Sequence, residues 1–270
     1  MNLANLAALG SAVLNFILQY GSMILDFVWG LALLIFGAYI PSLYTWVRWK
    51  IFINPKFRKV FMLKPNTKLN CILPSVTFPE YNEPEYIAYT TPFESVQFFK
   101  TLPIFAGLIG IETRDCNICL SEMVSDNEMQ DNVLCLGGPI HNRLCKQVLE
   151  THTDQVAFEK HDLVSVRSGK RYSAVIRSSK IVADTALMIV APNPWTEGGR
   201  LVILAGCRGY ASIGAFNFIS SRTGIIKLSG GLKKINASSI VYAIISTQVD
   251  HLTTNTIKYS KTKFEEIWAA

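Results

Sequence analysis

The sequence predicts an α/β protein that consists of an N-terminal transmembrane anchor and a larger cytosolic domain. Three observations lead to this prediction. The first 47 residues carry one charged side chain, Asp26, and seven basic residues then precede the next acid, Glu80. Farther along the chain, short apolar runs typical of buried strands alternate with helical patterns.

The predicted anchor begins at residue 23 and ends at residue 47. As a helix this segment would be about 37 Å long, against about 30 Å for the hydrocarbon core of a bilayer. Basic residues flanking a span stay on the cytoplasmic side, so we expect an inner-membrane protein whose C-terminal domain is cytoplasmic. The basic residues are Arg48, Lys50, Lys56, Arg58, Lys59, Lys64 and Lys68.

Upstream, residues 3–20 form a second apolar segment with its polar side chains on one stripe. The polar residues of the stripe, Asn5, Asn15, Gln19, Ser22 and Asp26, lie on it together with Ala8 and Ala12, at spacings of three and four that repeat every seven residues. Such a stripe indicates a seam between packed helices, and predicts a homo-oligomer within the lipid bilayer. Two interpretations remain open: the first helix of a transmembrane hairpin, or an interfacial helix with the stripe in water.

These patterns divide the chain into an anchor of one or two helices (1–50), a basic juxtamembrane linker (51–67) and a cytosolic α/β domain (68–270). The formal net charge of +6 resides largely in the juxtamembrane cluster. It therefore favours anionic lipid headgroups over nucleic acid as a partner. Arginines do not alternate with aromatic residues as in base-stacking surfaces, so no direct contact with nucleic acid is expected.

Six cysteines would be free thiols in a reducing cytoplasm. Cys116 and Cys119, followed by His141 and Cys145, have a spacing that could be made into a zinc site. Residues 116–120 favour a strand, however, and residues three apart on a strand point to opposite faces. We therefore predict no metal site.

Within the cytosolic domain the pattern predicts buried strands, two helices and a polar hairpin. Thr91, Pro92 and Glu94 form a capping-box arrangement that opens the first helix. This alternation predicts a Rossmann-like sandwich with an antiparallel portion. The expected strands are 68–78, 116–124, 132–136, 185–191, 201–205 and 239–249; the second helix is 211–221; the hairpin is 156–181; a turn is at 230–231; an amphipathic end is at 257–268.

Two glycine loops, each after an apolar strand, carry the candidate chemistry. Glycines let a ligand approach the backbone, helix N-termini favour anions, and Arg208 and Tyr210 suit a phosphate and an aromatic ring. The glycine spacing does not fit the dinucleotide fingerprint. Tight turns without any ligand are the open alternative. The candidate ligand-binding residues are Gly137, Gly138, Pro139, Asn142, Asn193, Gly206, Arg208, Gly209 and Tyr210.

Several of these residues resemble a prokaryotic family of Rossmann-like sensor domains. The layout of an anchor followed by a sensor is similar to transmembrane effectors of bacterial antiviral defence. The resemblance implies a nucleotide ligand, with no other cofactor indicated. Ala211-Ser212 replaces the expected Gly-Thr pair, which weakens any enzymatic expectation. The residues that carry the resemblance are Gly137-Gly138-Pro139, Asn142, Asn193-Pro194, Ala205-Gly206 and Gly209-Tyr210.

Three functions are therefore considered. The first is a membrane effector whose cytosolic domain senses a nucleotide-like ligand, or a protein encoded by a neighbouring gene, and whose helices oligomerise to perturb the membrane. The second is a membrane-tethered enzyme acting on a nucleotide or nucleoside, with Asp184, His141 and Asn142 as acid, base and positioning groups. The third is a structural anchor that docks a protein complex through a helix at 259–268. The sequence favours the first, and an enzyme is not the preferred interpretation.

Overall fold

A computed structural model describes residues 10, 11, 13, 15, 19–21, 28, 29, 54–61, 67–75, 92–232, 239–251 and 257–270. The chain divides into two units, Met1–Phe52 and Ile53–Ala270, which are treated separately. In the first unit the described residues are helical, and Asn15 and Gln19 of the predicted seam are exposed. Asn5 and Asp26 of that seam lie outside the described residues.

The prediction of an N-terminal transmembrane helix or hairpin is not supported. None of the helices in the described part of the chain combines the length and the apolar character that a membrane crossing requires. The longest of them is α3 (Pro92–Ile109), and its apolar residues Phe98, Leu102 and Phe105 are buried in the core of the domain. Most of the segment on which the prediction depended, residues 23–47, lies outside the described residues.

The second unit is a mixed α/β fold that is rich in sheet. Short buried strands form where apolar residues run together, and helices form where they recur at spacings of three and four. In chain order the elements are α2 (Asn54–Phe61), β1 (Leu69–Leu73), α3, η2 (Thr113–Asp115), β2 (Cys116–Leu120), η3 (Ser121–Met123), β3 (Asn132–Leu136), α4 (Arg143–Leu149), β4 (Val156–Glu159), β5 (Asp162–Ser165), β6 (Arg171–Tyr172), β7 (Val175–Arg177), β8 (Lys180–Pro192), β9 (Arg200–Gly206), α5 (Gly209–Ile219), α6 (Arg222–Gly231), β10 (Val241–His251) and β11 (Ile257–Ala269).

Within the described ranges, eight strands form the main sheet, in the order β11-β10-β8-β9-β3-β1-β2, with β7 paired to β8. The strands β9, β3, β1 and β2 are parallel, whereas β8 is antiparallel to both β9 and β10. A separate three-stranded sheet, β4-β5-β6, is called the small sheet below. The parallel strands follow the 2-1-3-4 order that occurs in doubly wound sheets.

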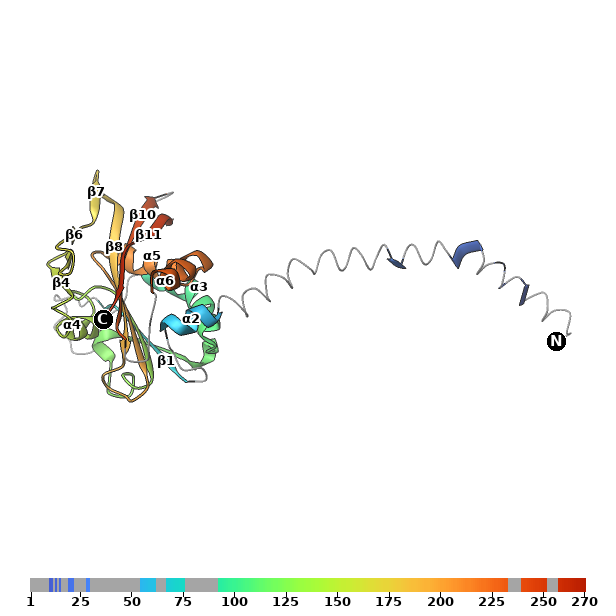
Figure 1. The fold of residues 1–270 in the computed structure, drawn as a ribbon, viewed down its shortest axis with the longest axis horizontal. Helices are drawn as coiled ribbons and strands as arrows, with labels where there is room; N and C mark the ends of the chain where they lie inside the picture. Colours follow the sequence, from blue (N-terminus) through green and yellow to red (C-terminus); the bar gives the residue numbers. More distant parts are fainter. Residues whose placement is uncertain are drawn as a thin grey trace. The chain divides into compact units, whose positions relative to one another are not determined.

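The helices α2, α3, α5 and α6 lie on one face of the main sheet, and α4 and the small sheet lie on the other (Figure 1). Side chains alternate along each strand, so β9 directs Leu201, Ile203 and Ala205 toward the α4 side. The opposite face is covered by α5, which contacts β8, β9 and β10, and by α2, α3 and α6, which pack around α5 and one another. The core therefore consists of two apolar layers separated by the sheet.

Three segments differ from the sequence expectation. The predicted linker 51–67 contains α2, whose Phe57, Val60 and Phe61 are buried. Gly230 and Gly231 end α6 instead of forming a hairpin turn. The amphipathic end is the strand β11, which pairs with β10 from Val241↔Ala269 to His251↔Ile257, and not a docking helix. The amphipathic pattern of these residues fits a helix as well as a strand, and it does not show that β10 is available for pairing.

Candidate functional site

The carboxyl ends of three parallel strands meet at one edge of the main sheet. Pro74 follows β1, Gly137 follows β3, and Cys207 follows β9. From β1 the chain passes through α3 to β2, and then returns past β1 to β3, so the winding direction reverses between β1 and β3. Ligands of open α/β sheets bind at such a reversal, outside the carboxyl ends of the strands.

The two predicted glycine loops contact each other at this edge. Gly137 has a φ of +99°, which only glycine adopts readily, and its N–H donates to the Leu204 carbonyl at 3.0 Å. A Cβ on Gly138 would lie 2.6 Å from the Gly206 carbonyl oxygen. These glycines are therefore required by loop-to-loop packing, in addition to any role in approaching a ligand.

A cavity of about 340 Å³ lies over the glycine loops. It is within the range of roughly 300–1,000 Å³ that small-molecule sites occupy. Among the described residues that line it, none is acidic, while Arg208, Lys160, His141 and His161 are basic or can become so. The lining residues are Pro74, Gly137, Gly138, Pro139, Ile140, His141, Phe158, Lys160, His161, Gly206, Cys207, Arg208, Gly209 and Tyr210.

The guanidinium of Arg208 has an unsatisfied hydrogen-bond donor at this cavity. Its Nε atom is buried and has no hydrogen-bond partner within the described residues. A buried donor without a partner costs about 1–3 kcal/mol, so such a group calls for an acceptor. Arg208 immediately precedes α5 and lines the cavity, so its charge lies beside the space that a ligand would occupy.

Beneath the cavity, the carboxyl group of Asp184 already occupies the N-terminus of α5. Its Oδ2 accepts from the Ala211 N–H at 2.8 Å and its Oδ1 from the Thr185 N–H at 2.9 Å. Burial raises the pKa of Asp184 to about 7, while these hydrogen bonds, one from the Arg208 N–H and the charge of Arg208 act to lower it. Asp184 therefore occupies the Ala211 N–H of α5, while Arg208, Gly209 and Tyr210 at the same end of the helix line the cavity.

Two of the predicted ligand-binding residues do not line the cavity. Asn142 is buried, donates to the Leu136 carbonyl at 2.7 Å and accepts from the Cys145 N–H at 3.0 Å, so it caps α4. Asn193 is at the opposite end of the sheet, where its amide donates to the carbonyls of Met129 and Asp131 at 2.8 Å. Both amides satisfy backbone groups instead of facing a ligand. The other seven predicted residues all line the cavity.

The residues considered for catalysis do not converge. His141 lines the cavity, but Asp184 faces the backbone of α5 and Asn142 faces main-chain carbonyls. Among the described residues there is also no group of three or more His, Cys, Asp or Glu side chains that could hold a metal ion. All six cysteines are free thiols, and Cys145 is fully buried on α4.

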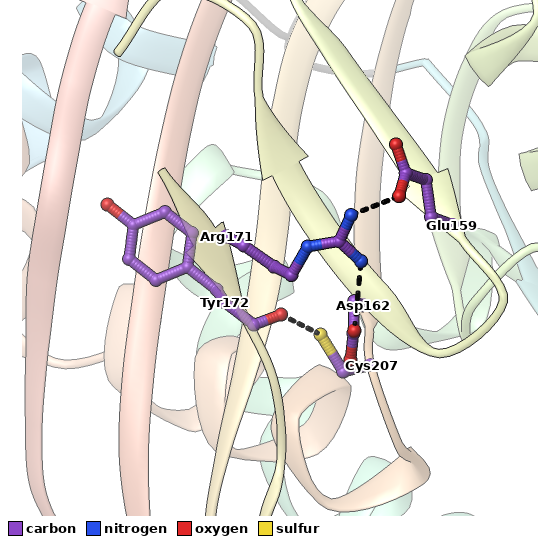
Figure 2. Close-up of polar contacts among 5 residues, drawn as sticks. All are labelled: Glu159, Asp162, Arg171, Tyr172 and Cys207. Carbon is purple, nitrogen blue, oxygen red and sulfur yellow. Dashed lines mark hydrogen bonds and ion pairs between the residues drawn. The ribbon is translucent and has the colours of Figure 1, made fainter. Parts of the chain in front are cut away.

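One wall of the cavity comes from the small sheet, which the sequence did not associate with the site. Phe158, Lys160 and His161 belong to the β4–β5 hairpin and line the cavity. The small sheet is attached to the loop after β9 by a hydrogen bond from the Cys207 thiol to the Tyr172 carbonyl at 3.5 Å (Figure 2). The only sequence signal was the predicted polar hairpin at 156–181, which gave no indication of what it covers.

The chain matches no protein-family model, no curated protein and no solved structure.

Proposed function

We propose that the described domain is a binding domain for a phosphorylated, nucleotide-like small molecule, which occupies the cavity at the carboxyl edge of the sheet. The observation that carries this proposal is the position of Arg208, together with Lys160, on a cavity whose described lining contains no acid. Charge-assisted hydrogen bonds from arginine to phosphate are among the strongest in proteins.

The other lining residues support a ligand that is both anionic and flat. Lys160, His141 and His161 add positive or ionisable groups around Arg208. Phe158 and Tyr210 provide aromatic rings, and the Tyr210 ring is held edge-on against His251, with 5.9 Å between the ring centroids. An aromatic base and a phosphate together match this combination better than a simple inorganic anion does.

A sensing role is supported more strongly than catalysis. Asp184 and Asn142, which the sequence suggested as catalytic groups, are both engaged by the backbone of the fold. Neither is available as a proton donor or as a positioning group at the cavity. We therefore favour ligand binding over catalysis as the role of this cavity.

The proposal is tested by titrating the full chain with AMP, ADP and inorganic pyrophosphate in a calorimeter. We expect at least one of them to bind, and Arg208→Ala to weaken that binding roughly 10- to 150-fold, because a charge-assisted hydrogen bond contributes about 1.5–3 kcal/mol. Arg208→Lys should fall in between, since it keeps the charge and loses the fork of donors.

Arg177→Ala is the matched control, because it removes the same charge from the exposed strand β7. We expect it to leave the affinity within about twofold of the wild type. If the folded wild-type chain binds none of the three probes, or if Arg208→Ala binds as tightly as the wild type, the proposed site is wrong.

A further inference from the structure

The β4–β5 hairpin brings two acidic residues to the edge of the cavity. Lys160 and His161 form its tip and line the cavity. Glu159 and Asp162 are the adjacent residues, and they lie opposite each other where β4 and β5 pair. A shallow depression beside the cavity is lined by both acids and also by Lys160, His161 and Arg208. Two carboxylates therefore lie close to the cations that would hold an anionic ligand.

Both carboxylates are bound by one residue, Arg171 of β6. Its Nη2 makes an ion pair with Glu159, and its Nη1 contacts Asp162 Oδ2 at 3.2 Å (Figure 2). The pKa of Asp162 is lowered, first by a hydrogen bond from Ser173 and then by Arg171, so this carboxyl group carries its charge. In the described part of the chain neither acid makes an ion pair with Arg208.

We propose that Arg171 is a positioning residue for ligand binding, which holds Glu159 and Asp162 so that they cannot compete with the ligand for Arg208. This inference rests on the function proposed above. The side chains of Arg171 and Glu159 are about half exposed, and such ion pairs contribute little to the stability of a fold. Arg171 and both acids line the same depression as Arg208, so the proposed role is at the cavity and not in stability.

The physical reason is that a carboxylate attached to the same chain is an effective competitor. A released Glu159 or Asp162 would be confined to the depression that contains Arg208, at a local concentration that flexible tethering places in the millimolar range. Without Arg171, either acid could pair with Arg208 or Lys160, and the ligand would have to displace it. Binding would weaken even though Arg171 itself does not line the cavity.

A double-mutant cycle separates this mechanism from a simple effect of net charge. The variants of the full chain are Arg171→Gln, the pair Glu159→Gln with Asp162→Asn, and all three changes together. The probe is AMP or inorganic pyrophosphate, whichever the wild-type chain binds more tightly. If charge acted only through space, removing the acids would improve affinity by the same factor whether or not Arg171 is present.

The positioning role predicts a strongly non-additive result. Arg171→Gln should weaken binding about tenfold, because it frees two like charges beside the anion site. The paired acid variant should stay within about twofold of the wild type, and the triple variant should recover to within about twofold. Arg171→Lys, which keeps the charge but cannot hold both acids in one fork, should fall between the wild type and Arg171→Gln.

Two outcomes overturn the inference in distinguishable ways. Additive effects, or a triple variant as weak as Arg171→Gln, would show that Arg171 does not act through the acids, while binding by the wild type and its loss in Arg208→Ala would leave the proposed function intact. Failure of the wild-type chain to bind either probe would remove the proposed function and this inference together. Near-ultraviolet circular dichroism establishes that each variant is folded.

Discussion

At the scale of single residues, Asp184 has the environment that most affects its chemistry. It is 1% exposed, and its two oxygens accept from the backbone of β8 and of α5. Arg208 and the Cys207 thiol lie close to it, and burial, followed by the charge of Asp184, raises the pKa of this thiol to about 12. A carboxyl group with a pKa near 7 changes its charge in the physiological range.

The raised pKa predicts how stability depends on pH. The ordinary value of 3.8 applies to the unfolded chain and about 7 to the folded one, so between these values the folded state holds a proton that the unfolded state has lost. Rising pH therefore favours unfolding from about pH 4 to about pH 7 and has no further effect through this group above pH 7.

The measurement is urea unfolding of the wild type and of Asp184→Asn at a series of pH values. Across this window the free energy of unfolding of the wild type should fall by up to about 4 kcal/mol relative to that of the variant, because each pKa unit corresponds to about 1.4 kcal/mol. Asparagine replaces one hydrogen-bond acceptor by a donor. This changes the free energy of unfolding of the variant by an amount that does not depend on pH. A difference between the two proteins that stays constant with pH would contradict the assigned environment.

At the scale of elements, α2 shows that a highly basic segment can be part of the core. Its eight residues are too few for a stable isolated helix, so its structure depends on packing. The Phe57 ring stacks on Phe61, with 4.4 Å between centroids, and meets the edge of Phe105 at 5.3 Å. These contacts attach α2 to α3, and through Phe105 to Phe216 of α5.

Replacing Phe57 by alanine should therefore destabilise the domain by about 3–5 kcal/mol, because it leaves a cavity beside the buried rings of Phe61 and Phe105. Phe99→Ala on α3 is the control, since Phe99 is 53% exposed and its loss should cost within about 1 kcal/mol. Both are measured by chemical denaturation. Equal effects of the two changes would mean that α2 is not part of the cooperative unit.

At the scale of the whole molecule, the side chain of Glu266 makes three hydrogen bonds between the main sheet and the small sheet with its β5–β6 turn. Glu266 of β11 accepts from Ser165 Oγ at 3.0 Å, from Ser168 Oγ at 2.6 Å and from the Tyr172 hydroxyl at 2.6 Å. The other attachment described above, Cys207 to Tyr172, is on the cavity side. The wall of the cavity thus depends on a residue near the far end of the chain.

We expect Glu266→Ala to speed amide hydrogen exchange in residues 156–172 by at least about tenfold, because three hydrogen bonds to a charged group are lost. Exchange in β3 and β9 should not change. Glu265→Ala is the matched control, since Glu265 bonds to Ser246 and Lys263 of the main sheet. Equal protection of the small sheet in both variants would show that Glu266 is not its anchor.

The sequence predicted what depends on local pattern. The strand 132–136 matches β3, because a wholly apolar run between polar residues is typical of a strand buried on both faces. The meeting of the two glycine loops also followed, since parallel strands end at one edge. Asn142 and Asn193 were assigned to the ligand because a sequence does not distinguish an amide that faces a ligand from one that satisfies buried carbonyls.

What escaped prediction depends on contacts between distant residues. Lys160 and His161 reach the cavity because the small sheet is held by Glu266, about a hundred residues farther along. Likewise, β11 shows alternating exposure that also fits an amphipathic helix, and only its pairing with β10 decides between them. Hydropathy alone also suggested a membrane span, which no helix in the described residues supports.

The close approach of Gly138 and Gly206 has an evolutionary consequence. The space where a side chain would begin on Gly138 is filled by the Gly206 carbonyl, and a Cβ on Gly206 would lie 2.2 Å from the Arg208 carbonyl oxygen. A side chain on Gly138 therefore requires the end of β9 to move, and a side chain on Gly206 requires the turn that contains Arg208 to move. The two glycines are therefore expected to constrain each other during evolution, because a side chain at either position displaces backbone near Arg208.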